Sequence, residues 1–287
     1  LPRLLLEVGE RKGDGGFAMR PHLRHQHKLE ELFLRVYVLV DDWLKENETR
    51  FGLPKQPRQI ASYGELFTIA VVGELLAQPY ESVWYWLVQQ NHRDLFPQLP
   101  DYSRYHRIMR NAEKLWAELA LMLATPVEGY RIIDAKPLPI AKGKRAEWAR
   151  LPEARKGFST MGMVYGFKLH ALVNEHGLFE RWGFASANHH EAKLAPELLE
   201  GLEQEVVGDK AFIGLEQIIT PKRKNMKKGC WNKALNRLRK RIETSFSVLV
   251  RSLTLHTAQV KTFWSLRARV NLKIAAHNLI HSGVLSR

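Results

Sequence analysis

The stretch that constrains this chain most strongly is residues 205–212, EVVGDKAF. It reads as a short apolar strand that ends in Gly208 and Asp209, with Lys210 next. A carboxylate at the end of a buried strand costs free energy unless a positive group satisfies it, either a neighbouring basic side chain or a bound metal ion. We therefore expect either a basic side chain or a bound metal ion beside Asp209.

Two further acids stand at comparable positions on other elements. The apolar segment 131–134 also ends in an aspartate, Asp134, and Glu243 lies in a basic helix expected over residues 231–253. Three carboxylates on separate elements are what a two-metal phosphoryl-transfer site requires. The sequence therefore points to phosphoryl-transfer chemistry.

Glu243 has a second interpretation. Asn236, Arg239 and Glu243 recur at three- and four-residue spacing beside the apolar stripe of their helix, so Glu243 should lie along the edge of the core. There it is available as a ligand for a hard cation. The alternative is a surface ion pair with Arg239 or Lys240, which would contribute little to stability.

The overall charge indicates the kind of partner. The 287 residues carry a net charge of +14 with a pI near 9.9, which favours a polyanion over a neutral ligand. A basic protein with no nucleic-acid role is the alternative. One cysteine, Cys230, excludes an internal disulfide and fits a reducing cytoplasm. No apolar run approaches about 20 residues, so we expect no membrane span.

The first part of the chain has a helical pattern. Residues 1–26 are expected to form a tail without structure, and residues 27–125 an all-helical region with a candidate helix-turn-helix. Its last helix is predicted from Ser103 to Leu123. The first turns of that helix carry arginines that suit a DNA major groove, although a solvated basic face on a packing helix is the alternative. These arginines are Arg104, Arg107 and Arg110.

The pattern changes to alternating strands after residue 126. Residues 165–173 and 178–187 alternate with period two around a turn signal, a helix is expected over 189–204, and a final helix over 263–281. We therefore expect an α/β domain with a mixed sheet over residues 126–287. His170 is a candidate residue near the acidic site, whereas His189 and His190 are expected to cap and pack because further zinc ligands are absent.

Four motifs in this order resemble bacterial insertion-sequence transposases of the DDE type. They are RIID at 131–134, YGFKLH at 165–170, GDKAF at 208–212 and RKRIETSFS at 239–247. The resemblance extends from about residue 66 to the C-terminus. It implies an RNase H-like catalytic domain in which Asp134, Asp209 and Glu243 form the catalytic triad and bind Mg²⁺, with Mn²⁺ as a substitute. Asn236 stands where many relatives have Tyr, and the basic residue expected after the Glu is met only approximately, by Arg251.

The implied reaction is cleavage at the ends of an insertion element followed by strand transfer into target DNA. The implied partner is double-stranded DNA in the cytoplasm, at the nucleoid, with a homodimer formed when two ends are brought together. A non-catalytic DNA-binding regulator, an inactive relict and a nuclease without strand transfer remain alternatives. Basic residues on several segments are expected to contact the DNA backbone. Besides the three arginines above, they are Lys142, Lys144, Arg145, Lys210, Arg239, Lys240 and Arg241.

Overall fold

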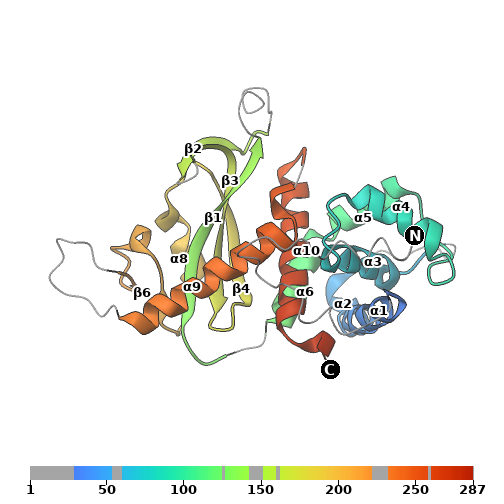
Figure 1. Cartoon of the computed structure of the whole chain (residues 1–287), viewed down its shortest axis with the longest axis horizontal. Helices are drawn as coiled ribbons and strands as arrows, with labels where there is room; N and C mark the ends of the chain where they lie inside the picture. The colour runs from blue at the N-terminus through green and yellow to red at the C-terminus, as the bar shows by residue number, and fades with distance from the viewer. Residues whose placement is uncertain are drawn as a thin grey trace, which may run out of the picture.

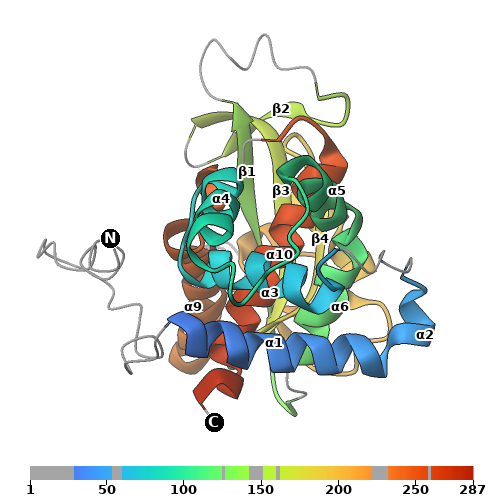
Figure 2. The ribbon, with the colours of Figure 1, turned by 90° about the vertical axis from the view of Figure 1, so that its right-hand side faces the viewer.

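The computed structural model describes residues 29–53, 60–124, 127–141, 151–159, 162–221, 232–257 and 260–286. The predicted tail over 1–26 therefore lies outside the described residues. The N-terminal helices pack around α3, which α1 crosses (Figure 2). Their bounds are α1 Leu29–Glu46, α2 Glu48–Phe51, α3 Tyr63–Leu75, α4 Glu81–Asn91, α5 Tyr102–Asn111 and α6 Glu113–Leu123.

A mixed sheet follows the helices, in the order β2-β3-β1-β5-β6, with β4 also paired to β3. The long β3 pairs with β1 in antiparallel orientation, and its two halves pair with β2 and β4. The short β5 and β6 run parallel to β1. The bounds are β1 Arg131–Ala141, β2 Arg155–Ser159, β3 Gly162–Asn174, β4 Phe179–Ser186, β5 Val206–Val207 and β6 Ile218–Ile219.

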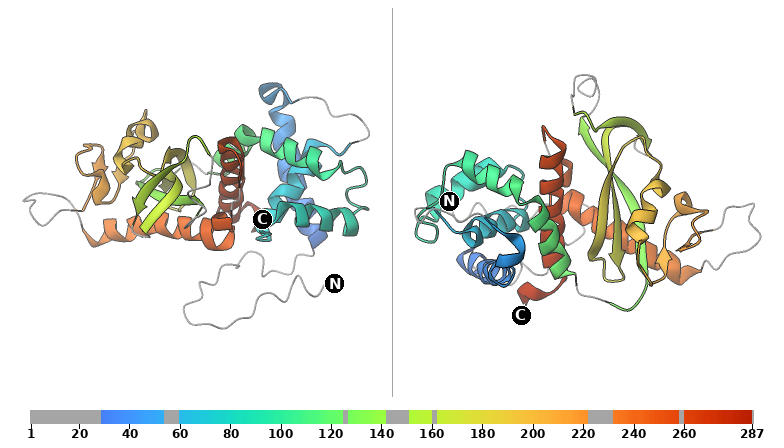
Figure 3. Two further views of the ribbon diagram at one scale, coloured as in Figure 1. Left: turned by 90° about the horizontal axis from the view of Figure 1, so that it is seen from above. Right: turned by 180° about the vertical axis from the view of Figure 1, so that it is seen from behind.

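Helices cover both faces of the sheet (Figures 1 and 3). On one face lies α9 (Lys233–Ser247), whose Ile242 and Phe246 join the larger apolar core. A π-helical turn, Val248–Ser252, continues α9. On the other face α8 (Ala195–Leu199) packs on a smaller cluster that contains Ile133 and Leu172.

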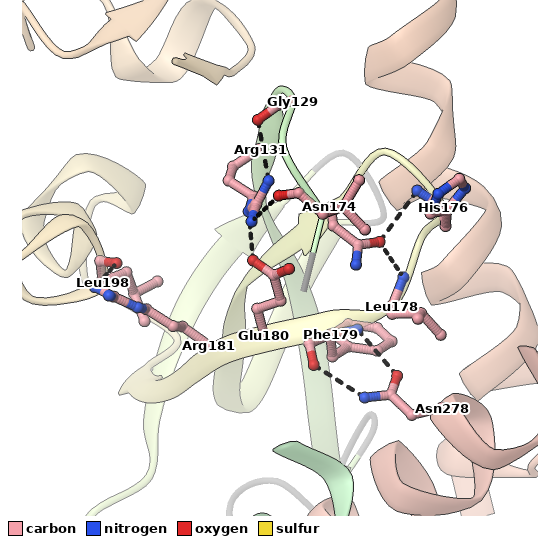
Figure 4. Close-up of polar contacts among 11 residues, drawn as sticks. Gly129, Arg131, Asn174, His176, Leu178, Phe179, Glu180, Arg181, Leu198 and Asn278 are labelled. Atoms are coloured by element: carbon pink, nitrogen blue, oxygen red, sulfur yellow. Dashed lines mark hydrogen bonds and ion pairs between the residues drawn. The ribbon is translucent and has the colours of Figure 1, made fainter. Parts of the chain in front are cut away.

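The last helix, α10 (Phe263–His281), joins the sheet to the N-terminal helices. The side chain of Asn278 accepts from the backbone N–H of Phe179 on β4 and donates to the carbonyl of Phe179 (Figure 4). It also donates to the carbonyl of Ala120 on α6. Buried Lys273 of α10 reaches Glu74 of α3 at 2.5 Å. Both halves therefore share one continuous core.

Two predicted helices differ from those observed. The helix expected over 103–123 is capped by Asp101 and breaks at Ala112, because the indole of Trp116 donates to the carbonyl of Met109 at the end of α5. The helix expected over 189–204 is reduced to the 3₁₀ turn η1 (Glu191–Lys193) and α8. Among the described residues, no helix is long and apolar enough to cross a membrane.

Candidate active site

Asp134 and Asp209 come to the same edge of the sheet. The parallel register pairs Ile132 with Val207, so the same register continued by two residues sets Asp134 beside Asp209. Gly208 between them fits tightly: a Cβ there would lie 3.1 Å from Cγ2 of Ile133. The close packing of these two strands therefore holds Asp209, just past the end of β5, beside Asp134 in the first half of β1.

Local hydrogen bonds orient both carboxylates. Oδ1 of Asp209 caps the 3₁₀ turn η2 (Lys210–Phe212) by accepting from the backbone N–H of Ala211 at 2.7 Å. Oδ1 of Asp134 accepts from the backbone N–H of Ala135 at 2.8 Å. These bonds use one oxygen of each carboxylate, so the second oxygen is the natural ligand atom for a cation.

The charge around Asp134 is predominantly negative. The pKa of Asp134 is raised to about 7, chiefly by burial and also by the charges of Asp209 and Glu191. The Ala135 hydrogen bond and the charge of Arg239 act in the opposite direction. Because desolvation and two like charges outweigh these favourable contacts, a divalent cation between the aspartates would relieve the repulsion.

Glu243 is differently engaged. Its helix α9 packs against β1 and β5, which brings Glu243 to the side of the sheet that Asp134 faces. Its side chain is 46% exposed, and its Oε1 lies 2.8 Å from Nη1 of Arg239, one turn earlier. The structure thus contains the surface ion pair that the sequence left open as an alternative.

The described residues contain no group of three or more Asp, Glu, His or Cys side chains positioned to hold a metal ion. The structure therefore brings together Asp134 and Asp209, with Glu243 on the adjacent helix but paired with Arg239. Two carboxylates with hard oxygen donors fit Mg²⁺ chemically. Glu243 would have to leave Arg239 to join them.

A further carboxylate, Glu191, was not selected from the sequence. It begins η1, which packs against η2, and its Oε1 lies 3.5 Å from Nζ of buried Lys168. His190 caps η1 by accepting from the N–H of Ala192. An acid at the start of a helix that follows a hairpin is the only local signal, and it is a common one.

His170 lies in the centre of β3, opposite Ala135. It is fully buried, and neither ring nitrogen has a hydrogen-bond partner within the described part of the chain. Its pKa is lowered to about 4, chiefly by burial and also by the charges of Lys168 and His189. His170 is therefore a neutral imidazole beside the acidic edge.

The basic residues expected to contact DNA have different environments. Lys210 is exposed directly after Asp209, and Lys240 and Arg241 are exposed on α9. Three others lie outside the described residues: Lys142, Lys144 and Arg145.

The three arginines of α5 also differ from one another. Arg107 is exposed, and Arg104 is half-buried. The guanidinium of Arg110 lies 5.6 Å from the ring centroid of Trp264 on α10, with its Nε buried. Arg110 thus contributes to packing between α5 and α10, whereas Arg107 faces solvent.

Residues 124–260 match the family model described as "Transposase DDE domain", which covers just under half of the chain. Asp134, Asp209 and Glu243 all lie within the matched segment. Searches of curated proteins and of solved structures found no match.

Proposed function

Since residues 124–260 belong to the transposase DDE domain family, we propose that this chain cuts DNA at the ends of an insertion element and joins them to target DNA. The observation that carries the proposal is the juxtaposition of Asp134 and Asp209 on neighbouring parallel strands. A family match to a DDE domain implies a DNA substrate and transfer of a nucleotidyl group. The two aspartates supply the acidic edge at which such chemistry takes place.

We propose that the sheet is an RNase H-like catalytic domain. The supporting feature is a central β1 flanked by antiparallel β3 on one side and parallel β5 on the other, with helices on both faces. In this arrangement the first acid lies in the central strand, the second follows the neighbouring parallel strand, and the third lies in a helix that packs over both.

In the proposed site Asp134 and Asp209 hold divalent cations, Mg²⁺ or Mn²⁺, and Glu243 completes the ligand set. Bound in a pair, such ions act as Lewis acids that activate water or a 3′-hydroxyl and stabilise the charge on the leaving oxygen. The hydrogen bonds from the backbone N–H groups of Ala135 and Ala211 orient the two aspartates. Arg239, when Glu243 is released, becomes free to neutralise a DNA phosphate.

The basic surface would hold the DNA around this edge. Lys210, Lys240 and Arg241 are exposed near the acids, and Arg107 is exposed on α5. We propose that the N-terminal helices bind the element end and that two chains act together when two ends are paired. Such a protein would work at the nucleoid, where its DNA substrate is located.

The test is cleavage and joining of a labelled duplex that carries the element's own terminal sequence. Wild type and Asp209→Asn are compared in Mg²⁺ and in EDTA, with DNA binding measured in parallel. Metal-dependent cleaved and joined products that are lost in Asp209→Asn, with DNA binding kept, would support the proposal. Products that persist in Asp209→Asn would overturn the site assignment.

Two other outcomes would indicate the alternative functions. Cleaved products without joined products would indicate a metal-dependent nuclease. DNA binding without any product from the wild type would indicate a regulator or an inactive relict. The ion pair between Arg239 and Glu243 is the observation that favours this second candidate, because it keeps the third acid from the other two.

A further inference from the structure

Two of the most exposed large apolar side chains lie opposite each other on the antiparallel strands β2 and β3. Phe158 is 82% exposed, the highest value of any large apolar side chain among the described residues, and Met163 is 63% exposed. The register pairs Phe158 with Met163, so both side chains stand on the same face of the two strands. We call these two side chains the apolar patch. Apolar surface exposed in this way marks a candidate contact site.

The strand that carries Phe158 is held firmly in place. Gly157, the residue before it, lies so close to the neighbouring chain that an added Cβ would be 2.0 Å from the carbonyl oxygen of Ala187. Just before β2, the carbonyl of Glu153 accepts from the hydroxyl of Ser186 at 2.6 Å. The apolar patch is therefore presented in a defined position, and a partner would not have to order it on binding.

The charge of these strands suits an anionic partner. β2 contains Arg155 and Lys156, both exposed, and neither β2 nor β3 contains an acidic residue. The guanidinium of Arg155 donates to the carbonyls of Pro152 and Ala154, which leaves Lys156 as the better phosphate ligand. Lys156 is two residues before Phe158, so it shares the face of the apolar patch. A cation beside an aromatic ring is the combination that holds a nucleic-acid strand, because the cation binds phosphate and the ring stacks on a base.

The size of the apolar patch favours a base over a protein surface. A stable protein interface buries about 800 Å² on each partner, far more than two side chains provide. A ring with a thioether beside it matches the face of one base, and apolar side chains that stack on bases or insert between them recur in DNA-binding proteins. In a continuous duplex each base is covered by its neighbours in the stack. The patch would therefore need a base that is unpaired or unstacked.

The apolar patch is separate from the acids. Met163 lies eight residues before Ala171 on β3, and Ala171 pairs with Asp134. At roughly 3.3 Å per residue, the separation along the strand is up to about 26 Å. DNA that reaches both places would span about eight base pairs, since neighbouring base pairs are roughly 3.4 Å apart. A base at the patch therefore lies beside the reacting position, and the patch takes no part in the chemistry.

We propose that the apolar patch of Phe158 and Met163 is a binding site for an unpaired DNA base, with Lys156 holding an adjacent phosphate. Phe158 supplies the ring on which the base stacks, and Met163 extends the apolar surface at its edge. This inference rests on the proposed function for its DNA substrate. It adds a place, away from the acids, at which opened or distorted DNA is bound in preference to a regular duplex.

The test compares the affinity of the full chain for two labelled duplexes of the same arbitrary sequence, one fully paired and one with a single unpaired adenine. Fluorescence anisotropy in EDTA gives both affinities, and their ratio does not depend on cleavage. Wild type should bind the duplex with the unpaired adenine about tenfold more tightly, and Phe158→Ala should reduce this preference to less than about twofold. Phe158→Tyr, which keeps a ring, should retain the preference. Because Phe158 is exposed, Phe158→Ala should also keep the wild-type midpoint of thermal unfolding.

Two further variants separate the roles. Tyr80→Ala removes a ring that is 63% exposed at the start of α4, and it should leave the preference unchanged. Lys156→Gln should weaken binding to both duplexes by the same factor, because each duplex offers a phosphate. Equal affinities of wild type for the two duplexes, or a preference that Phe158→Ala keeps, would overturn the inference.

A contact between copies of the chain is the competing use of the apolar patch. A wild-type dimer in light scattering that Phe158→Ala converts to a monomer, with no preference for the unpaired adenine, would overturn the inference in favour of that contact. The cleavage and joining assay separates this site from the proposed function. Products from wild type without the preference would reject this site alone, whereas the preference without any products would support this site and reject the proposed function.

Discussion

The carboxylate of Glu243 lies 2.8 Å from the guanidinium of Arg239, one helical turn earlier in α9. Arg239 also acts on Asp134, whose pKa its charge lowers. One arginine therefore interacts with two of the three acids expected to bind the metal. In the absence of metal, Arg239 serves as their counter-ion.

Arg239→Gln should therefore change the response to metal in a specific direction. The variant frees Glu243 and removes a positive charge near Asp134, so Mn²⁺ affinity without DNA should rise by about threefold. Arg237→Gln is the matched control, because Arg237 is exposed on the same helix. Calorimetric titration measures both. A weaker affinity in Arg239→Gln would show that Arg239 organises the acids instead of competing with the metal.

The sequence predicted the elements that local signals define. The last helix was expected over 263–281 and is observed as Phe263–His281, where the hydroxyl of Thr262 caps its first turn. The break at Ala112 was missed because it depends on Trp116 reaching back to Met109. Such a contact follows from how the helices pack and not from periodicity.

The candidate site was likewise predictable only where local sequence signals define it. Asp209 follows the short apolar strand β5 as expected, whereas β1 continues past Asp134 to Ala141. The parallel pairing of β1 with β5 brings the two aspartates together. The approach of Glu191 depends on η1 packing against η2, for which the sequence has no signal. The sequence left the partner of Glu243 open. Arg239 lies four residues earlier on the same helix, so the two side chains can pair whether or not Glu243 also binds a metal ion.

Arg107 and Arg110 of α5 should give different phenotypes. Arg107→Gln removes an exposed charge, so DNA affinity should fall and the slope of log affinity against log salt should become shallower by about one. Arg110→Gln loses the contact with Trp264 and should lower stability by about 1 kcal/mol. Fluorescence anisotropy at several salt concentrations and urea unfolding measure these effects. An unchanged salt slope in Arg107→Gln would remove α5 from the DNA interface.

The buried pair between α10 and α3 should be important for stability. Lys273 is fully buried and lies 2.5 Å from Glu74 and 2.6 Å from the carbonyl of Leu253. Lys273→Met leaves Glu74 buried without its counter-ion and should lower the free energy of unfolding by about 3–5 kcal/mol. Urea unfolding tests this.

Two further variants test whether the loss of stability comes from the unpaired buried charge. Adding Glu74→Gln to Lys273→Met removes the unpaired charge and should recover part of the loss. Lys45→Met breaks an ion pair with Asp41 in which the lysine is exposed, and it should lower stability much less than Lys273→Met does. Equal losses for Lys273→Met and Lys45→Met would show that the buried pair contributes no more than a surface one.

His277 should make stability depend on pH. Its ring is buried against Phe179, and its pKa is lowered to about 3, chiefly by burial and also by the charge of His281. The unfolded chain takes up the proton near pH 6.5 and the folded chain does not, so this histidine lowers stability as the pH falls from about 6.5 toward 3. From pH 7 to pH 5 the loss is about 2 kcal/mol.

His277→Phe keeps a ring at this position and removes the proton site. Its free energy of unfolding, followed by urea titration at several pH values, should fall less than that of wild type below pH 6.5. His256→Phe, at an exposed position, serves as the control and should follow the wild-type curve. Parallel curves for His277→Phe and wild type would exclude His277 as a source of the pH dependence.

The central claim is that Asp134 and Asp209 together hold one divalent cation site, and iron-directed cleavage of the backbone tests it most directly. Fe²⁺ takes the place of Mg²⁺, and ascorbate with peroxide generates radicals that cut the chain next to the bound metal. We expect cuts close to both Asp134 and Asp209, suppressed by excess Mg²⁺ and absent from Asp134→Asn and Asp209→Asn. Cuts at only one of the two aspartates, or a pattern unchanged in both variants, would contradict the claim.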